Sequence, residues 1–177
     1  MKFKLKKSLI KVAALTMIFS LNASSVVFAG DFDISYHMGE NAVINKISEN
    51  GTIYIVGDST ACEYGYDENY AVFRAGWGMY LPKYISGNRK VVNLALSGRS
   101  SKSFTVEENY KKLKESLRAG DCLLIQFGHN DAKKSTEEDL KNRYTDPEGD
   151  INIDGSFKNS LYKNYIKLAE EKGAVPV

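Results

Sequence analysis

The sequence predicts a three-layer α/β/α sandwich built around a parallel β-sheet. Short apolar stretches rich in β-branched residues alternate with segments whose apolar residues recur every three or four positions, as they do in helices. The first three apolar stretches each end at a glycine or at a Ser-Gly pair. Strands that alternate with helices form parallel sheets that are covered on both faces.

Four segments have the composition of strands in such a sheet. Three are runs of apolar and β-branched residues at 52–56 (TIYIV), 90–96 (KVVNLAL) and 122–127 (CLLIQF), and a fourth begins at 174–177 (AVPV). Ligands of open α/β sheets bind outside the carboxyl ends of the strands. A functional site is therefore expected in the turns that follow these segments.

Three further segments are expected to be helices, at 76–85, 107–117 and 157–172. In the second of them, Tyr110, Leu113 and Leu117 recur at helical spacing. Gly173 follows the third helix in the position of a C-cap. The two remaining stretches are polar: 133–155, which contains Pro147, is predicted to be a long surface loop, and 30–50 a lead-in segment.

The composition is that of a single globular domain, which we place at residues 51–177. Hydrophobic residues make up 43% of the 177 residues, and two cysteines are too few for a disulfide scaffold or a cysteine-rich zinc module. Five of the 24 basic residues lie within residues 1–29, which hold no acid, so the remaining 19 face 22 acidic residues. Nucleic acid is therefore not the expected partner, because binding phosphates requires clustered Lys and Arg.

Residues 1–29 have the features of an export signal. A lysine-rich start at 1–11 precedes a ten-residue, uncharged and mainly apolar stretch at 12–21, and small or short residues, Val27 and Ala29, occupy the two positions that a signal peptidase reads. A membrane-spanning helix needs about 20 apolar residues, so no stable membrane anchor is expected. We predict cleavage after Ala29 and a secreted protein that begins at Gly30.

The turns after the first three strands carry residue types suited to acyl transfer. Ser59 follows the first strand, Gly98 the second and Asn130 the third. Each also has an ordinary interpretation: a helix cap, a turn glycine and a loop asparagine bonded to its own backbone. Together they supply a nucleophilic hydroxyl and three donors: the backbone N–H groups of Ser59 and Gly98 and the side-chain amide of Asn130. Such a set could form an oxyanion hole.

Three blocks in order resemble those of the GDSL/SGNH hydrolases: GDST at 57–60, NLALSGRSS at 93–101 and FGHND at 127–131. AGWG at 75–78 lies between the first block and the second. The combination is similar to the rhamnogalacturonan acetylesterase branch, which removes acetyl groups from pectin. The resemblance extends from about residue 52 to residue 177 and implies a flavodoxin-like fold. It also implies an acetylated polysaccharide or oligosaccharide as substrate, without a metal or a cofactor.

The resemblance assigns Ser59 as the nucleophile that is acetylated and then hydrolysed by water, with Gly98 and Asn130 completing the oxyanion hole. The family's base and its orienting acid lie in a late Asp-x-x-His block, which this sequence lacks. We therefore expect the chain to be truncated at its C-terminus and nearly inactive alone. His129 and His37 are poor substitutes, because His129 belongs to the third block and His37 precedes the domain.

Two alternatives to an acetylesterase remain. The chain could be an inactive, carbohydrate-binding remnant of the same fold, or a lipase- or thioesterase-like SGNH hydrolase; the AGWG and FGHND blocks favour the carbohydrate branch. A separate run of oxygen-bearing side chains suggests a calcium site but lacks the spacing of an EF-hand loop. It comprises Asp146, Glu148, Asp150, Asn152 and Asp154.

Overall fold

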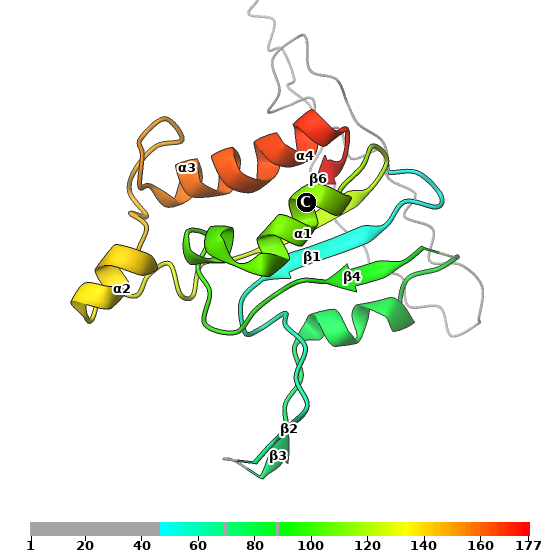
Figure 1. The fold of residues 1–177 in the computed structure, drawn as a ribbon, viewed down its shortest axis with the longest axis horizontal. Helices are drawn as coiled ribbons and strands as arrows, with labels where there is room; N and C mark the ends of the chain where they lie inside the picture. Colours follow the sequence, from blue (N-terminus) through cyan, green and yellow to red (C-terminus); the bar gives the residue numbers. More distant parts are fainter. Residues whose placement is uncertain (1–46, 69–70, 88) are drawn as a thin grey trace, which may run out of the picture.

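The computed structural model of the chain describes residues 47–68, 71–87 and 89–177. The predicted export signal and most of the lead-in segment lie outside the described residues. A four-stranded parallel sheet forms the centre of the fold (Figure 1). Its strands, in spatial order, are β4 (Val91–Asn93), β1 (Ile53–Gly57), β5 (Cys122–Gln126) and β6 (Val175–Pro176).

The strand order confirms the predicted fold class. In chain order these strands are the second, first, third and fourth of the sheet, which is the flavodoxin-like arrangement. The chain leaves β1 toward β4 on one side and returns to β5 on the other, so the order reverses beside the carboxyl end of β1. Ligands of such sheets bind at this switch point, and Ser59 lies two residues beyond Gly57, where β1 ends.

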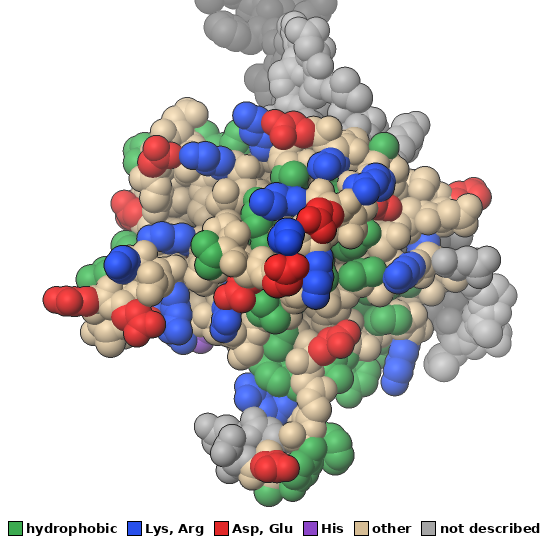
Figure 2. All heavy atoms as spheres, in the orientation of Figure 1, with side chains coloured by type: hydrophobic (Ala, Val, Ile, Leu, Met, Phe, Trp, Pro, Cys, Tyr) green, Lys and Arg blue, Asp and Glu red, His purple; other side chains and the backbone are tan. Residues whose placement is uncertain are grey.

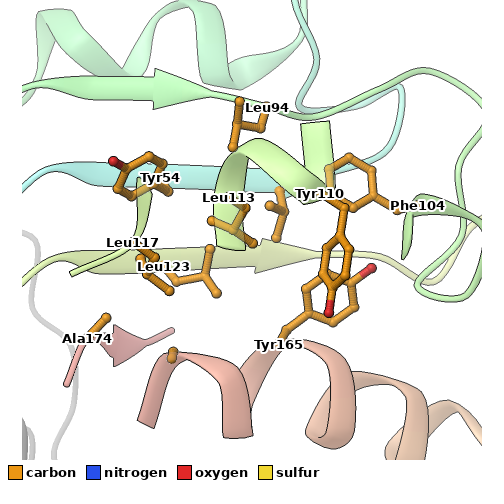
Figure 3. Close-up of a cluster of buried hydrophobic side chains, with 11 residues drawn as sticks. Tyr54, Leu94, Phe104, Tyr110, Leu113, Leu117, Leu123, Tyr165 and Ala174 are labelled. Atoms are coloured by element: carbon orange, nitrogen blue, oxygen red, sulfur yellow. The ribbon is translucent and has the colours of Figure 1, made fainter. Parts of the chain in front are cut away.

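One face of the sheet is covered by α1 (Glu108–Ser116) and by a continuous helical stretch of α3 (Phe157–Leu161), η5 (Tyr162–Ile166) and α4 (Lys167–Lys172). Tyr54 and Val56 of β1 belong to the same buried cluster as Leu113 of α1. Figure 3 shows Tyr54 and Leu113 within this cluster. An aromatic cluster closes the end of this core; its rings belong to Phe104, Tyr110, Phe127 and Tyr165.

The other face of the sheet is covered by a smaller core and by short helical turns. Ile55 of β1 packs there with Ala61, Cys62 and Ala95, and Leu81 lies against them. The helix predicted at 76–85 is wrong in type, because the segment forms two 3-10 turns, η2 (Trp77–Met79) and η3 (Leu81–Lys83). Pro82 lacks an N–H group for a helical ladder, and two buried glycines hold the backbone against the sheet layer.

The predicted loop at 133–155 is wrong in part, because it contains helix α2 (Glu137–Asn142). Thr136 caps this helix by accepting a hydrogen bond from the N–H group of Asp139 at 3.0 Å. The acidic residues in its first turn stabilise the helix, because the N-terminus of a helix carries a partial positive charge. Because its stability comes from caps and charges, the apolar spacing used for the other helices did not reveal it.

Three short elements were not expected from the sequence. They are the hairpin strands β2 (Tyr66–Asp67) and β3 (Val72–Phe73) and the 3-10 turn η4 (Ser103–Val106). The helix predicted at 157–172 is present and ends at Gly173, although its middle is a π-helical turn. Both cysteines are buried and unpaired, and no helix within the described ranges is long and apolar enough to cross a membrane.

Candidate active site

Ser59 lies in a tight turn at the carboxyl end of β1. The carbonyl of Asp58 accepts hydrogen bonds from the N–H groups of Ala61 and Cys62 at 3.2 and 3.1 Å, which closes the turn. Ser59 is half-buried, and within the described part of the chain neither its hydroxyl nor its N–H group has a hydrogen-bond partner. Both groups of Ser59 are therefore available to a ligand.

Asp58 stabilises this turn from inside the protein. Its side chain is fully buried, and its Oδ1 accepts hydrogen bonds from the N–H group and the hydroxyl of Thr60, both at 2.9 Å. A longer contact of 3.5 Å joins the same oxygen to the amide nitrogen of Gln126 on β5. The carboxylate therefore holds the backbone on the far side of Ser59 and connects the turn to the neighbouring strand.

The AGWG block packs directly against the turn of Ser59. A Cβ atom on Gly76 would lie 2.3 Å from the carbonyl oxygen of Cys62, and one on Gly78 would lie 2.5 Å from that of Ala61. Trp77 donates its backbone N–H to the carbonyl of Thr60 at 2.9 Å. The two glycines are thus needed, because any side chain would push the turn of Ser59 out of place.

Gly98 follows β4 and faces the same edge of the sheet. Its φ of +77° lies in the left-handed region that favours glycine, and a Cβ atom there would have open space around it. The segment that leads to Gly98 lies directly beside the turn of Ser59, because Leu96 donates its N–H to the carbonyl of Gly57 at 3.0 Å. Like that of Ser59, the N–H group of Gly98 has no hydrogen-bond partner among the residues that the structure describes.

Asn130 is 1% exposed and lies in the turn after β5. Its amide nitrogen donates to the carbonyl of Arg99 at 3.0 Å. Its side chain is therefore tied to the loop of Gly98, which argues against an asparagine bonded only to its own neighbours. The amide has a second N–H group, which is the donor that the predicted oxyanion hole requires.

Asp131 cross-links two of the three turns and was missed by the sequence analysis. Its carboxylate accepts hydrogen bonds from the hydroxyl of Ser101 at 2.5 Å and from the hydroxyl of Thr145 at 3.0 Å. The same Ser101 hydroxyl lies 2.8 Å from that of Ser160. Burial raises the pKa of the Asp131 carboxyl above its usual value, although these hydrogen bonds partly oppose the shift. The sequence could have indicated this cross-link, because an acid directly follows Asn130 and two serines, Ser100 and Ser101, follow Gly98 within three residues.

Within the described residues, no base contacts Ser59. His129 is exposed, and no hydrogen bond or ion pair joins it to another residue of the described ranges. His37 lies outside those ranges. The oxygen-rich run at 146–154 forms no metal-binding cluster, since no group of three or more His, Cys, Asp or Glu side chains in the described chain could hold an ion.

An open groove of about 370 Å³ lies between the turns of Ser59 and Gly98. Its lining residues come from these two segments: Cys62, Glu63, Tyr64, Ala95, Leu96, Ser97 and Arg99. The hydroxyls of Tyr64 and Ser97 meet across it at 3.3 Å. The groove carries charges of both signs, because Glu63 and Arg99 both line it. Arg99 also pairs with Glu107 at 2.8 Å. A small polar ligand could enter this groove, whose lining begins at Cys62, three residues beyond Ser59 in the chain.

Comparison with known proteins places these turns in a family. Residues 53–168 match the GDSL-like Lipase/Acylhydrolase family. The Bacillus subtilis (strain 168) protein YesY, named as a probable rhamnogalacturonan acetylesterase, is 38% identical over 125 residues, which are 71% of this chain and 51% of YesY. The rhamnogalacturonan acetylesterase of Emericella nidulans is 36% identical over 99 residues, which are 56% of this chain and 35% of that protein.

A solved structure supports the same grouping. The crystal structure of YxiM from Bacillus subtilis is 28% identical, with a TM-score of 0.53 over 73% of this chain and 32% of that one. The chain spans about half the length of YesY and less of the other two proteins. The matched region includes the three sequence blocks, AGWG and the three turns at the sheet edge. The chain therefore belongs to the GDSL-like lipase/acylhydrolase family.

Proposed function

We propose that the protein is a secreted carbohydrate esterase that removes O-acetyl groups from rhamnogalacturonan or a related pectic polysaccharide. The observation that carries the proposal is the linkage of three turns at the sheet edge. Gly57 bonds to Leu96, and Asn130 bonds to Arg99, so the turns of Ser59, Gly98 and Asn130 form one unit. The names of the relatives favour an acetylated carbohydrate as substrate.

The reaction proceeds in two steps. The Ser59 hydroxyl oxygen attacks the acetyl carbonyl carbon and passes its proton to a base. The N–H groups of Ser59 and Gly98 and the amide of Asn130 stabilise the negative oxygen; one such donor lowers the barrier by about 3 kcal/mol. The C–O bond to the sugar then breaks, and the sugar oxygen takes the proton back. Water hydrolyses the acetyl-Ser59 ester and releases acetate.

The base for this chemistry is expected in a later Asp-x-x-His block, as the family resemblance implies. A serine hydroxyl is a weak nucleophile without an adjacent base. A second candidate function follows from this: because no base contacts Ser59 in the described chain, the 177-residue chain could bind an acetylated carbohydrate without cleaving it.

Acetate release from acetylated rhamnogalacturonan tests the proposal. The product of the complete gene should release acetate, and its Ser59→Ala variant should not, with an unchanged melting temperature. Ser135→Ala, which alters an exposed serine of the loop before α2, is the matched control and should keep full activity. Equal acetate release by wild type and Ser59→Ala would rule out Ser59 as the nucleophile. Substrate binding without any acetate release would favour the second candidate.

A further inference from the structure

The β2–β3 hairpin exposes apolar side chains away from the core. It projects from the sheet as a narrow arm, and hydrophobic side chains cover part of its end (Figures 1 and 2). Phe73 is 84% exposed and Tyr66 is 53% exposed, and Val72 is also exposed. The two rings meet edge to face with centroids 5.2 Å apart. Each ring is thus ordered by the other while much of its surface stays open to solvent.

The base of the arm is fastened to the groove beside Ser59. Arg74, which follows β3, donates to the hydroxyl of Tyr64 at 3.3 Å, and its guanidinium lies 4.4 Å from the centre of the Tyr64 ring. Tyr64 in turn reaches Ser97 across the groove. Arg74 also donates its backbone N–H to the carbonyl of Gly65 at 3.4 Å. The arm is therefore continuous with one wall of the groove.

An isolated two-stranded hairpin is at best marginally stable in water. A ligand that covers the exposed rings would therefore stabilise the hairpin. A groove of about 370 Å³ lies at the small end of ligand pockets, so a polymer seated in it must continue over a neighbouring surface. An aromatic face carries a negative quadrupole and suits the C–H groups of a sugar ring. The three exposed apolar side chains that the structure describes on this arm are far fewer than the roughly 20–30 residues per side of a stable protein interface.

We propose that the β2–β3 hairpin is a saccharide-binding arm. Phe73 and Tyr66 contact sugar units next to the one whose acetyl ester reaches Ser59, while the groove between Tyr64 and Ser97 holds the acetylated unit itself. This inference rests on the proposed function. It adds to that function the surface that binds the neighbouring sugar units of the polymer.

The test compares a small and a large substrate with the product of the complete gene. Phe73→Ala should raise the KM for acetylated polysaccharide by about 3- to 10-fold, which corresponds to the usual worth of one aromatic contact. The kinetics with p-nitrophenyl acetate should stay unchanged, since this ester needs only the groove. Phe73→Tyr retains a ring and should restore the wild-type KM. Leu140→Ala on α2, where the side chain is 48% exposed, is the control and should change neither substrate.

Binding to Ser59→Ala separates this inference from the proposed function. Affinity electrophoresis in a gel containing deacetylated polysaccharide should retard Ser59→Ala, and adding Phe73→Ala should remove the retardation. An unchanged KM and unchanged retardation in Phe73→Ala would overturn the saccharide arm. A dimer in light scattering that Phe73→Ala dissociates would also overturn it and assign the arm to a second copy of the chain. If the wild-type protein released no acetate while its retardation still depended on Phe73, the esterase would be refuted and the saccharide arm would stand.

Discussion

The hydroxyl of Ser101 donates a hydrogen bond of 2.5 Å to the carboxylate of Asp131, and the N–H group of Ser101 lies 3.1 Å from both oxygens of the same carboxylate. This pair joins the loop that follows Gly98 to the turn that follows Asn130. Tyr165 donates to the carbonyl of Ser101 at 2.7 Å and thereby attaches the pair to the helical layer. The relative position of two predicted oxyanion donors therefore depends on a carboxylate that is itself 3% exposed.

Asp131→Ala should destabilise the protein by about 3 kcal/mol, because it leaves buried donors of Ser101 and Thr145 without an acceptor. Urea unfolding followed by circular dichroism measures this loss. The control is Asp154→Ala, which removes an exposed carboxylate 3.8 Å from Lys163 and should cost less than about 1 kcal/mol. Equal midpoints for Asp131→Ala and wild type would show that the cross-link does not stabilise the fold.

The stability of the protein should depend on pH through Asp131. Burial raises the pKa of this carboxyl above its ordinary value, so the folded state binds its proton more tightly than the unfolded state does. The protonated carboxyl stabilises the fold at low pH, and this contribution is lost as the pH rises through the raised pKa. The unfolding free energy of wild type minus that of Asp131→Asn should fall across this window. A difference that rises with pH would contradict the sign of the shift.

Asn130→Ala should lower the turnover number for acetate release by about 100- to 1000-fold, the usual effect of removing one oxyanion donor. It should also cost about 1 kcal/mol of stability, because the hydrogen bond to the carbonyl of Arg99 is lost. Turnover and thermal unfolding measured on the same sample separate the two effects. Asn142→Ala at the exposed end of α2 should change neither quantity. Wild-type turnover in a folded Asn130→Ala protein would remove this residue from the site.

Gly76→Ala should cost about 1–3 kcal/mol, because the added Cβ atom would overlap the backbone of Cys62. The displaced turn should also slow the reaction of Ser59 with a fluorophosphonate probe. Gly65→Ala offers a matched control, since a Cβ atom there meets nothing within 4 Å. Urea unfolding measures the stability of both variants. Equal losses of stability in Gly76→Ala and Gly65→Ala would contradict the packing argument.

Cys122 should react slowly with iodoacetamide in the folded protein at pH 8. Burial raises the pKa of its thiol to about 11, so only about one thiol in a thousand is ionised at that pH. The chain holds two free and buried cysteines, so denaturation should expose two reactive thiols per molecule. A thiol count by mass spectrometry before and after denaturation checks both points. A denatured count of zero would show that the cysteines are paired.

Export should remove residues 1–29 and leave Gly30 at the N-terminus. The lysine-rich start, the uncharged apolar stretch at 12–21 and the short residues Val27 and Ala29 are together typical of a cleaved export signal. Intact mass measurement of protein from the culture medium determines the cleavage site. Secreted protein that still begins with Met1 would contradict the prediction.

Local patterns in the sequence were sufficient to predict the parallel sheet and the positions of the three turns. Strands such as 122–126 (CLLIQ) are short and apolar because they are covered by other layers, and this pattern is local. The blocks around Ser59, Gly98 and Asn130 were equally visible, since each directly follows a strand. Both predictions needed only neighbouring residues and the rule that parallel strands end at the same edge.

The contacts that support those turns could be seen only in the tertiary structure. The hydrogen bond between Ser101 and Asp131 joins residues 30 apart, and the packing of Gly76 against Cys62 turned a predicted helix into two 3-10 turns. The arm of Tyr66 and Phe73 also became visible only in space. Local periodicity reports which face of an element is buried, whereas these contacts depend on which distant backbone lies against it. Their energies come from close packing and desolvated hydrogen bonds, which exist only once the layers have assembled.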